Sequence, residues 1–449
     1  MNLLFNLVAV QPIHSAKFHG GGSYGEVIFW ALVDRLYGRS QLPSAVFRTF
    51  TDWENEMNMA DDAEAAAAGD AEASAVAGDA ETTDMADSKS DLSQNRKDVR
   101  LFCVYDSHKY LSPDILAACK NCGIPLFDIA KKTPQQIIDE NAIDTFYTPL
   151  YSLESKWQIQ VKRFVFTWHG VRALEMQYSW QGLGFAKKLA QKLEALVRYR
   201  KIWKKLYYAP KYRELAARIA DGRAECITVS EHSCASIKSF FPELLDKEIP
   251  VFYSPMIDYE PEGFLPPGVN AKNFFLLTSG ARWEKNNLRA VKAFDELVTM
   301  MQSTKHKFNM KLVITGATNV KAYRKHIRNK DAFVFLGYVE SKELEFLHKN
   351  AYAFVFPSLN EGFGYPPVQS MRYGVPVAAS GSTSVPEVCE NAVLYFDPYS
   401  VSEIKNRMIQ LFDSDIYMKH MARGIVRYAE VRKRQQEDLE KTVAFVLGE

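Results

Sequence analysis

The sequence lacks an apolar run long enough to cross a bilayer, and no Lys or Arg precedes its apolar start. A membrane-spanning helix needs about 20 mostly apolar residues, and a secretory signal begins with a basic segment. We therefore expect residues 3–10 to form a buried first strand and the protein to be cytoplasmic. Cysteine is scarce as well. The six cysteines, which suit a reducing compartment and form no disulfide framework, are scattered at positions 103, 119, 122, 226, 234 and 389.

A metal-binding pattern is also missing. Cys119 and Cys122 form one Cys-x-x-Cys pair, but a structural zinc site would need a second pair at workable spacing. Gly123 follows directly, so the pair is better interpreted as a helix end. An Asp-x-Asp metal role is not supported either, because Asp413 and Asp415 fall late, between two helical patterns. We expect no bound metal and no cofactor.

The formal net charge of +1 hides a strong asymmetry. Residues 54–91 hold twelve Asp or Glu against one Lys, a local balance of −11, which leaves +12 for the rest of the chain. Residues 55–95 are rich in Ala, Asp, Glu and Ser, and such a segment cannot bury enough apolar surface to offset its ordering entropy. We predict a solvated acidic insertion at about residues 55–95.

A chain of 449 residues is too long for one ordinary core, which predicts two or three domains. Short apolar runs alternate with helical patterns, and this alternation predicts α/β domains with parallel, doubly wound sheets. We place the first domain at residues 1–257. A turn-rich linker at 258–270 opens the second, at 258–425, and a helical segment follows at 426–449. The expected strands are residues 3–10, 100–105, 125–129, 145–147, 163–167, 226–229, 274–279, 311–315, 332–336, 353–356 and 375–379.

A glycine-rich loop is predicted at residues 11–25, between the first strand and a helix at 26–37. It reads His19-Gly-Gly-Gly22-Ser-Tyr-Gly25, and Gly20, Gly22 and Gly25 have the dinucleotide-binding spacing. Strand, glycine loop and helix start let backbone N–H groups approach a phosphate. No well-placed acidic residue follows on a second strand about twenty residues later, as a dehydrogenase would need, so we disfavour that class.

The most informative stretch is residues 353–398. A buried strand is expected at 353–356, a loop at 357–367, a helix at 368–373 and a second strand at 375–379. A second loop then leads into a helix with Pro386 near its first turn. Two polar loops rich in Gly and Ser thus follow neighbouring strands. In an open α/β sheet, ligands bind at the carboxyl ends of the strands.

This stretch resembles the donor site of the family 4 glycosyltransferases, which are retaining enzymes of the GT-B fold. The resemblance rests on Glu361-Gly-Phe-Gly-Tyr-Pro-Pro-Val-Gln-Ser-Met-Arg-Tyr-Gly-Val-Pro-Val, followed by Ser384-Val-Pro-Glu387. It implies two Rossmann-like domains with an interdomain cleft, and a last helix that crosses back to the first domain. It also implies metal-independent transfer of a hexose from a UDP- or GDP-sugar to a glycan or lipid-linked glycan. There is one departure, because Gln369 stands where the family usually has a second glutamate.

The resemblance implies roles for four candidate catalytic residues. Glu361 would hydrogen-bond hydroxyls of the donor sugar, and His169, which follows the expected strand at 163–167, would lie near that sugar. Arg282 and Lys285 would clamp the diphosphate, because fixed cations can neutralise the charge that the leaving group gains. No nucleophile or general base is assigned, since enzymes of this kind are thought to let the leaving phosphate assist the incoming hydroxyl.

The resemblance also implies a set of donor-binding groups. Gln369 would accept a hydrogen bond from the ribose through its amide oxygen, more weakly than a carboxylate would. The other groups act through the backbone or at a helix start, against phosphate, sugar or base. They are Gly21 and Gly22 in the first domain and Gly337, Tyr338, Gly362, Phe363, Gly364 and Ser384 in the second.

Residues 186–213 carry ten Lys or Arg and one Glu, with leucines and aromatic residues between them. This composition is typical of a helix that docks on anionic lipid, so we predict peripheral contact with the inner face of the membrane. One alternative is a solvated helix whose apolar side joins the core. Another is nucleic-acid binding, which no recognisable motif supports and which we do not expect.

Two other functional classes stay open from sequence. Gln369 allows a nucleotide-sugar-binding scaffold with little or no transferase activity. The basic segment allows a peripheral membrane adaptor. Release of UDP or GDP from nucleotide sugars would separate an enzyme from a scaffold, and lack of flotation with anionic liposomes would remove the adaptor.

Overall fold

The computed structural model describes residues 1–12, 20–44, 46, 49, 98–151, 157–186, 188–198, 200–304 and 308–449. The predicted acidic insertion at 55–95, His19 and Lys187 lie outside the described residues. The chain forms two compact units. Unit 1 comprises residues 1–166 and 439–449, and unit 2 comprises residues 167–438. The predicted domain boundaries at 257/258 and 425/426 stay predictions.

The first six-stranded sheet is parallel and has the order β3-β2-β1-β4-β5-β6. Its first strand pairs with β2 on one side and with β4 on the other, so the strand order reverses at β1. Between these strands, unit 1 also holds η1 (Leu7–Ala9), α1 (Gly20–Tyr37), η2 (Arg39–Gln41), α3 (Pro113–Asn121) and α4 (Pro134–Glu140). The strands are β1 (Asn2–Asn6), β2 (Arg100–Tyr105), β3 (Leu126–Asp128), β4 (Thr145–Thr148), β5 (Arg163–Trp168) and β6 (Glu225–Thr228).

The second sheet lies in unit 2 and repeats this plan, with the order β12-β11-β10-β7-β8-β9. All its pairings are parallel, and the order reverses at β7, which pairs with β10 and β8. The two sheets confirm the predicted fold class, an α/β protein with two Rossmann-like, doubly wound sheets of the GT-B kind. The strands are β7 (Phe274–Leu277), β8 (Lys311–Ile314), β9 (Phe333–Phe335), β10 (Ala353–Phe356), β11 (Val377–Ser380) and β12 (Leu394–Phe396).

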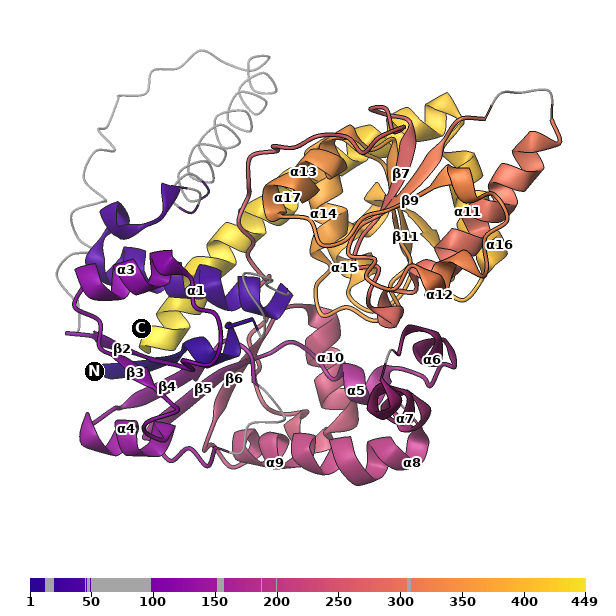
Figure 1. Cartoon of the computed structure of the whole chain (residues 1–449). Coiled ribbons are helices and arrows are strands. Elements are labelled where there is room, and N and C mark those ends of the chain that lie inside the picture. The colour runs from indigo at the N-terminus through magenta and orange to yellow at the C-terminus, as the bar shows by residue number, and fades with distance from the viewer. Residues whose placement is uncertain are drawn as a thin grey trace, which may run out of the picture. The chain divides into compact units, whose positions relative to one another are not determined.

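Helices cover both faces of the second sheet (Figure 1). Alternate residues of β7 point to opposite faces, as the strand period requires. Phe275 joins one core with residues of α11 and α16, whereas Phe274 joins another with residues of α13, α14 and α15. The helices on these faces are α11 (Asn287–Gln302), α12 (Lys321–Arg324), α13 (Ser341–Asn350), α14 (Tyr365–Arg372), α15 (Val385–Cys389) and α16 (Val401–Gln410).

The rest of unit 2 consists of short helices and the long last helix up to residue 438. It includes a π-helical segment, η4, between α8 and α9. The elements are α5 (Arg172–Glu175), α6 (Gln181–Phe185), α7 (Leu189–Val197), α8 (Lys201–Trp203), η4 (Lys204–Tyr208), α9 (Ala209–Ala220), α10 (Glu231–Phe240), η5 (Pro242–Leu244), η6 (Trp283–Lys285), η7 (Lys330–Ala332), η8 (Glu390–Ala392) and α17 (Ser414–Leu447).

Two predicted helix starts were wrong, and both helices begin earlier. Helix α1 begins at Gly20, so Gly20, Gly21 and Gly22 form its first turn instead of a loop. Gly25 lies inside the helix, and glycine is required there because a Cβ would stand 2.0 Å from Val10 Cγ1. Helix α14 begins at Tyr365, since prolines fit the first turn, where no intrahelical N–H bond is lost.

The end of the chain belongs to unit 1. Arg163, at the start of β5, donates hydrogen bonds from its guanidinium to the carbonyl oxygens of Phe445 (2.7 Å) and Val446 (3.0 Å) in the last turns of α17. Residues 439–449 are therefore a structural part of the first unit. Among the described helices, none is both long and apolar enough to cross a membrane.

Candidate active site

Three loops of unit 2 meet at the carboxyl edge of the second sheet. They follow β7, β10 and β11, which are neighbours in the order β11-β10-β7. Because β7 and β10 are adjacent in space but distant in sequence, the strand order switches between them. This switch point is where doubly wound sheets bind ligands. The loops bring together residues 278–286, 357–364 and 381–384.

Lys285 and Glu361 form a buried ion pair at this switch point. Lys285 Nζ donates to Glu361 Oε1 at 2.6 Å, and the two side chains are 10% and 12% exposed. Burial lowers the pKa of Lys285, although the charge of Glu361 opposes that shift. Burial raises the pKa of Glu361, but the charge and hydrogen bond of Lys285 outweigh it, so the net pKa lies below its ordinary value. The carboxylate of Glu361 is therefore held ionised.

Two arginines add positive charge to this pair. Arg282, which precedes η6, and Arg172, which opens α5, both lower the pKa of Lys285 through their charge. Arg172 also lowers the pKa of Glu361. Both effects require the guanidinium groups to lie near the pair. A concentration of cations around one carboxylate leaves net positive charge, which favours an anionic ligand.

The loop after β7 is joined directly to the loop after β10. Leu359 N donates to Glu284 O at 3.0 Å. Asn286 adopts a left-handed conformation with φ 58°, and its side chain donates to Pro357 O at 3.0 Å and Pro398 O at 2.6 Å. Asn tolerates this conformation better than most residues. The turn that carries Lys285 is thereby fixed against the loop that carries Glu361.

The loop after β11 holds the backbone of Glu361 in place. Glu361 N donates to Thr383 Oγ1 at 3.0 Å, and Ser384 Oγ donates to Glu361 O at 3.1 Å and Phe363 O at 2.8 Å. Ser384 is fully buried. The structure thus brings the predicted Ser384 into contact with the predicted loop 361–364, but the hydroxyl supports that loop instead of facing outward.

Gly362 packs against the backbone of His169. A Cβ at Gly362 would stand 2.4 Å from His169 O, so only glycine fits. Gly362 O accepts hydrogen bonds from Ser230 Oγ at 2.7 Å and Ser233 Oγ at 3.3 Å, at the start of α10. The structure therefore places the backbone of His169 next to the loop of Glu361, and the predicted role of its side chain near the donor sugar stays a prediction.

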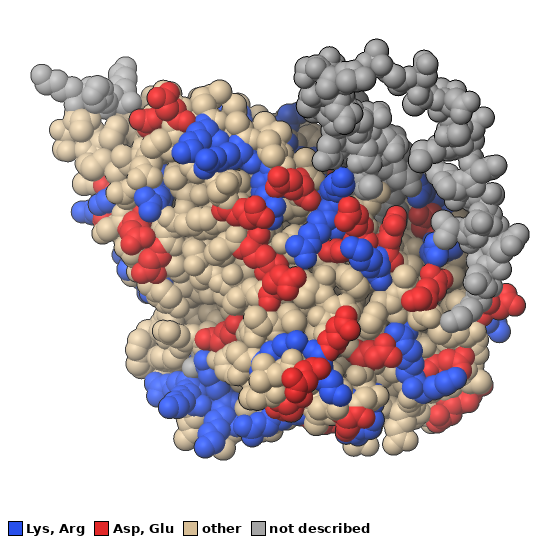
Figure 2. Space-filling model, turned by 180° about the vertical axis from the view of Figure 1, so that it is seen from behind, with Lys and Arg blue, Asp and Glu red and all other residues tan. Residues whose placement is uncertain are grey.

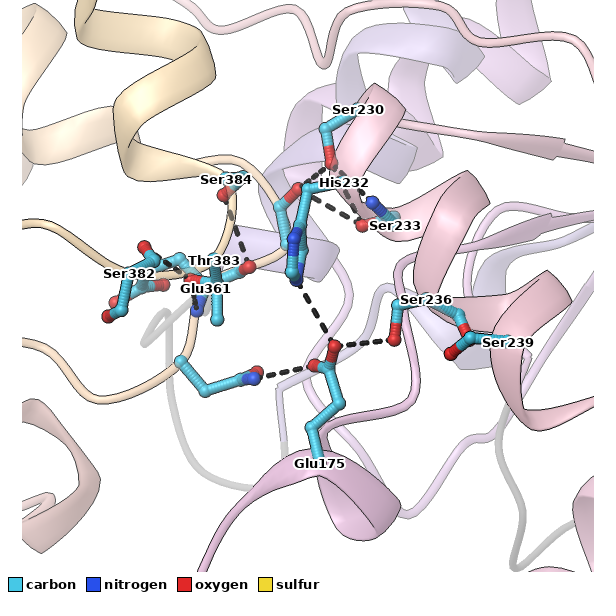
Figure 3. A network of polar contacts seen from close by, with 12 residues as sticks. Glu175, Ser230, His232, Ser233, Ser236, Ser239, Glu361, Ser382, Thr383 and Ser384 are labelled. Carbon is cyan, nitrogen blue, oxygen red and sulfur yellow. Dashed lines mark hydrogen bonds and ion pairs between the residues drawn. The ribbon is translucent and has the colours of Figure 1, made fainter.

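A second polar network lies beside this loop (Figure 3). The carboxylate of Glu175 accepts a hydrogen bond from Asn360 Nδ2 at 2.6 Å and from Ser236 Oγ, and it lies 3.1 Å from His232 Nε2. Burial opposes ionisation of Glu175, but these three partners lower its pKa to about 2. Because Asn360 directly precedes Glu361, Glu175 links α5 to the candidate site.

Gln369 lies on α14 and faces α13. Its Nε2 donates to Glu345 Oε1 at 2.8 Å, and Tyr373 Oη donates to Glu345 Oε2 at 2.8 Å. Burial raises the pKa of Glu345 to about 7, against the opposing hydrogen bonds of Tyr373 and Gln369. This hydrogen bond uses the amide nitrogen of Gln369. The amide oxygen, Oε1, is the atom of the side chain that can accept a hydrogen bond.

The other predicted donor-binding groups are placed as follows. Phe363 is buried, with its ring centroid 5.2 Å from that of Tyr253, and Gly364 has φ 108°. Gly337 and exposed Tyr338 follow β9, which lies two strands from β7 in the sheet order. Because the strands are parallel, this loop lies at the carboxyl end of the sheet, as the loop after β7 does. Gly21 and Gly22 belong to unit 1. Their predicted contact with the donor stays a prediction.

Sequence patterns did not predict four residues that the structure adds to this region. They are Arg172, Glu175, Asn360 and Thr383. Arg172 and Glu175 follow His169-Gly170 within a few residues, so the cluster of charged groups after the fifth strand was an available signal. Asn360 and Thr383 adjoin predicted residues, but their hydrogen bonds depend on contacts distant in sequence.

The segment that carries this site matches a known protein family. Residues 269–428 match Glycosyl transferases group 1. The matched segment contains Arg282, Lys285, Glu361 and Gln369 and covers the second sheet with its flanking helices.

Curated relatives match shorter parts of this chain. O-antigen chain mannosyltransferase B of Escherichia coli is 40% identical over 94 residues, which is 21% of this chain and 25% of that protein. O-antigen chain mannosyltransferase RfbU of Salmonella typhimurium is 30% identical over 131 residues, 28% of this chain and 35% of that protein. The matches thus span only a quarter to about a third of these relatives.

Solved structures share the fold over a larger part of the chain. Anabaena HepE in complex with UDP superposes with a TM-score of 0.51 at 13% identity and covers 78% of this chain and 92% of that one. The HepE complex with UDP-glucose has a TM-score of 0.50, 13% identity and coverage of 78% and 91%. These likenesses concern the fold alone.

Proposed function

We propose that this protein is a glycosyltransferase that moves a hexose from a UDP- or GDP-sugar to a glycan or lipid-linked glycan. The observation that carries this proposal is the buried Lys285–Glu361 pair at the sheet switch point, inside the segment that matches Glycosyl transferases group 1. Because the partly matched relatives are O-antigen chain mannosyltransferases, mannose is the first sugar to test, with an O-antigen-type glycan as acceptor.

We propose retaining, metal-independent transfer. The bond between the anomeric carbon and the donor phosphate oxygen breaks, and the acceptor hydroxyl oxygen forms the new bond on the same face of the sugar. The hydroxyl proton passes to the leaving diphosphate. Arg172, Arg282 and Lys285 can supply the positive charge that stabilises this diphosphate, and each fixed cation is worth several kcal/mol when it acts on developing charge in a site that excludes water.

Within this scheme, Glu361 positions the donor sugar. Its carboxylate is held ionised by Lys285 and fixed by the loop after β11, so it can accept hydrogen bonds from sugar hydroxyls. His169, next to Gly362, would donate to another hydroxyl. Gln369 would accept from the ribose through Oε1, since Glu345 occupies Nε2. As a neutral acceptor it should hold the ribose more weakly than a carboxylate would.

The decisive experiment is turnover of a panel of UDP- and GDP-sugars, followed by release of the free nucleotide. We expect at least one sugar to be consumed faster than in buffer, and Lys285→Met to lower kcat/KM by about 100-fold, the usual cost of losing one charge-stabilising group. Lys330→Met, which removes an exposed lysine of the same unit, is the matched control and should keep full activity.

The second candidate function is a nucleotide-sugar-binding scaffold, and Gln369 is the observation that favours it. Donor-induced thermal stabilisation without any nucleotide release, in the presence of glycan acceptors, would support the scaffold and contradict transfer. Equal activity of the wild type and Lys285→Met would contradict the proposed role of the ion pair. We further propose that the enzyme works in the cytoplasm at the inner face of the membrane, with residues 186–213 toward the lipid.

A further inference from the structure

An open pocket of about 480 Å³ in unit 2 is lined, among the residues that the structure describes, by three cations and no carboxylate. Its lining residues are Gln177, Tyr178, Arg200, Lys201 and Lys204. The Arg200 guanidinium lies over two rings, 4.8 Å from the centroid of Tyr178 and 5.7 Å from that of Trp180. Lys204 is tied down, because its Nζ donates to Leu174 O at 2.6 Å. Aromatic stacking and this hydrogen bond hold two of the cations in defined positions.

The elements beside the pocket expose large aliphatic side chains. Leu189 and Leu193 lie one turn apart on α7, and they are 75% and 56% exposed. Ile202 on α8 and Leu206 on η4 are 69% and 68% exposed. Singly exposed leucines are ordinary, but four on consecutive elements mark an interaction surface. We call these four residues the aliphatic rim.

Positive charge surrounds the aliphatic rim. Glu194 is the one acidic residue in the sequence of residues 188–213. Its carboxylate pairs with Arg198 at 3.0 Å. Figure 2 shows blue side chains gathered at the lower left of the view, where this part of unit 2 lies. The exposed Lys and Arg of the segment are Lys188, Lys192, Arg200, Lys201, Lys205 and Arg213.

The pocket adjoins the candidate active site through one small apolar cluster. Tyr178 and Trp283 pack against Met176 and Leu359. Trp283 follows Arg282 in the chain, and Leu359 precedes Asn360. A group bound at Tyr178 and Arg200 would therefore lie one layer of side chains from the loops that carry Lys285 and Glu361.

We propose that this pocket binds the phosphate of an anionic phospholipid while the aliphatic rim enters the boundary between headgroups and acyl chains. Charge complementarity fits the cations to the phosphate, and basic elements with exposed leucines are typical of interfacial membrane contact. Nucleic acid fits less well, because its bases stack on aromatic rings and leave an aliphatic rim without a partner. This proposal deepens the membrane contact proposed above for residues 186–213 and rests on it. The contact requires neither donor nor acceptor, so failure to bind vesicles would leave the proposed transfer reaction standing, and absence of turnover would leave the lipid contact standing.

The test is co-sedimentation of the full chain with vesicles of phosphatidylcholine, with and without phosphatidylglycerol. We expect binding to the anionic vesicles only, and weaker binding as salt rises. The double variant Arg200→Gln, Lys201→Gln should weaken binding by about tenfold, because each basic side chain near an anionic surface contributes to binding. The variant Leu189→Gln, Leu193→Gln, Ile202→Gln should lower it similarly. These side chains are exposed, so the variants should keep their thermal stability.

Matched controls change the same chemistry elsewhere. Lys120→Gln with Lys131→Gln removes two exposed lysines of unit 1, and Phe264→Gln removes a side chain that is 95% exposed. Both should bind vesicles like the wild type. The proposal is overturned if the wild type does not prefer anionic vesicles, or if controls and pocket variants weaken binding equally. It is also overturned if glycerol phosphate or an RNA oligonucleotide binds while vesicles do not.

Discussion

The close backbone contact at Gly362 explains why this position requires glycine. Its missing side chain allows the backbone of His169, which directly follows β5, to approach, and a Cβ would stand 2.4 Å from the carbonyl oxygen of His169. Two serine hydroxyls hold the carbonyl of Gly362 as well. The position is therefore closed to substitution for reasons of packing, whatever its role in binding.

We predict that Gly362→Ala destabilises the protein by about 1–3 kcal/mol, the usual cost of forcing extra atoms into a packed region. The expected result is a lower midpoint of urea unfolding and reduced turnover, because the loop of Glu361 must shift. Gly184→Ala is the control, since a Cβ at Gly184 would meet only the flexible side-chain end of Lys325, at 3.8 Å. An unchanged midpoint for Gly362→Ala would contradict the contact with His169.

At the same scale, the sequence offered four candidate catalytic residues through the family resemblance, and their roles stay predictions. Glu361, Arg282, Lys285 and His169 each follow a short apolar run that the structure shows as a buried strand. The Lys285–Glu361 pairing was not predictable, because it depends on the adjacency of β7 and β10 in the sheet order. Arg172 lies in a charged cluster just after His169 that the sequence did show, but its nearness to this particular pair depends on the fold.

At the scale of elements, the contact between α13 and α14 explains the departure from the family pattern at Gln369. Its amide nitrogen donates to buried Glu345, which lies on the neighbouring helix. A glutamate at position 369 would place two carboxylates within hydrogen-bond distance, and such a pair can keep only one charge easily. The neutral amide is thus suited to its neighbour.

We predict that Gln369→Glu lowers thermal stability at about pH 8 by about 1–3 kcal/mol, with much of the loss recovered at about pH 5, where the pair can share a proton. Calorimetry at both pH values measures this difference. Gln410→Glu, in the same unit on α16, should show no such pH dependence. Equal stability of Gln369→Glu and wild type at the higher pH would refute the explanation.

Strand positions were easier to predict than helix starts. Short apolar runs located β2, β8 and β10 within one residue, because buried parallel strands are almost continuously apolar. The starts of α1 and α14 were missed, since glycine and proline argue against helix in a sequence. Close packing at Gly25 and the tolerance of a first turn for proline override that preference.

At the scale of the whole molecule, two buried carboxyl groups make stability depend on pH. Burial raises the pKa of Glu26 in unit 1 and of Glu345 in unit 2 from the ordinary 4.5 to about 7. The folded state thus holds these protons more tightly than the unfolded state. Their contribution to stability is complete below pH 4.5 and is lost as the pH rises through 7.

Below about pH 6.5 buried His348, whose pKa burial lowers to about 3, acts in the opposite direction. We therefore predict that the free energy of unfolding falls between about pH 6.5 and pH 8, by about 1 kcal/mol for each group, since each pKa unit is worth about 1.4 kcal/mol. Urea unfolding at a series of pH values measures the slope. Glu345→Gln should remove part of the decline, whereas Glu403→Gln, which changes an exposed side chain on α16, should leave it intact. A wild-type stability that rises over this range would contradict the raised pKa values.

The doubly wound plan was also predictable at this scale, because alternating strands and helices allow few other topologies. The division into units depends on which distant side chains pack together, which sequence patterns alone do not give. Unit 1 is formed by two stretches that are distant in sequence, residues 1–166 and 439–449. Arg163 connects them by hydrogen bonds to backbone carbonyl oxygens near the end of α17. A chimera that replaces unit 1 must therefore exchange residues 439–449 together with residues 1–166. One that exchanges residues 1–166 alone would lose the native contacts between these two segments.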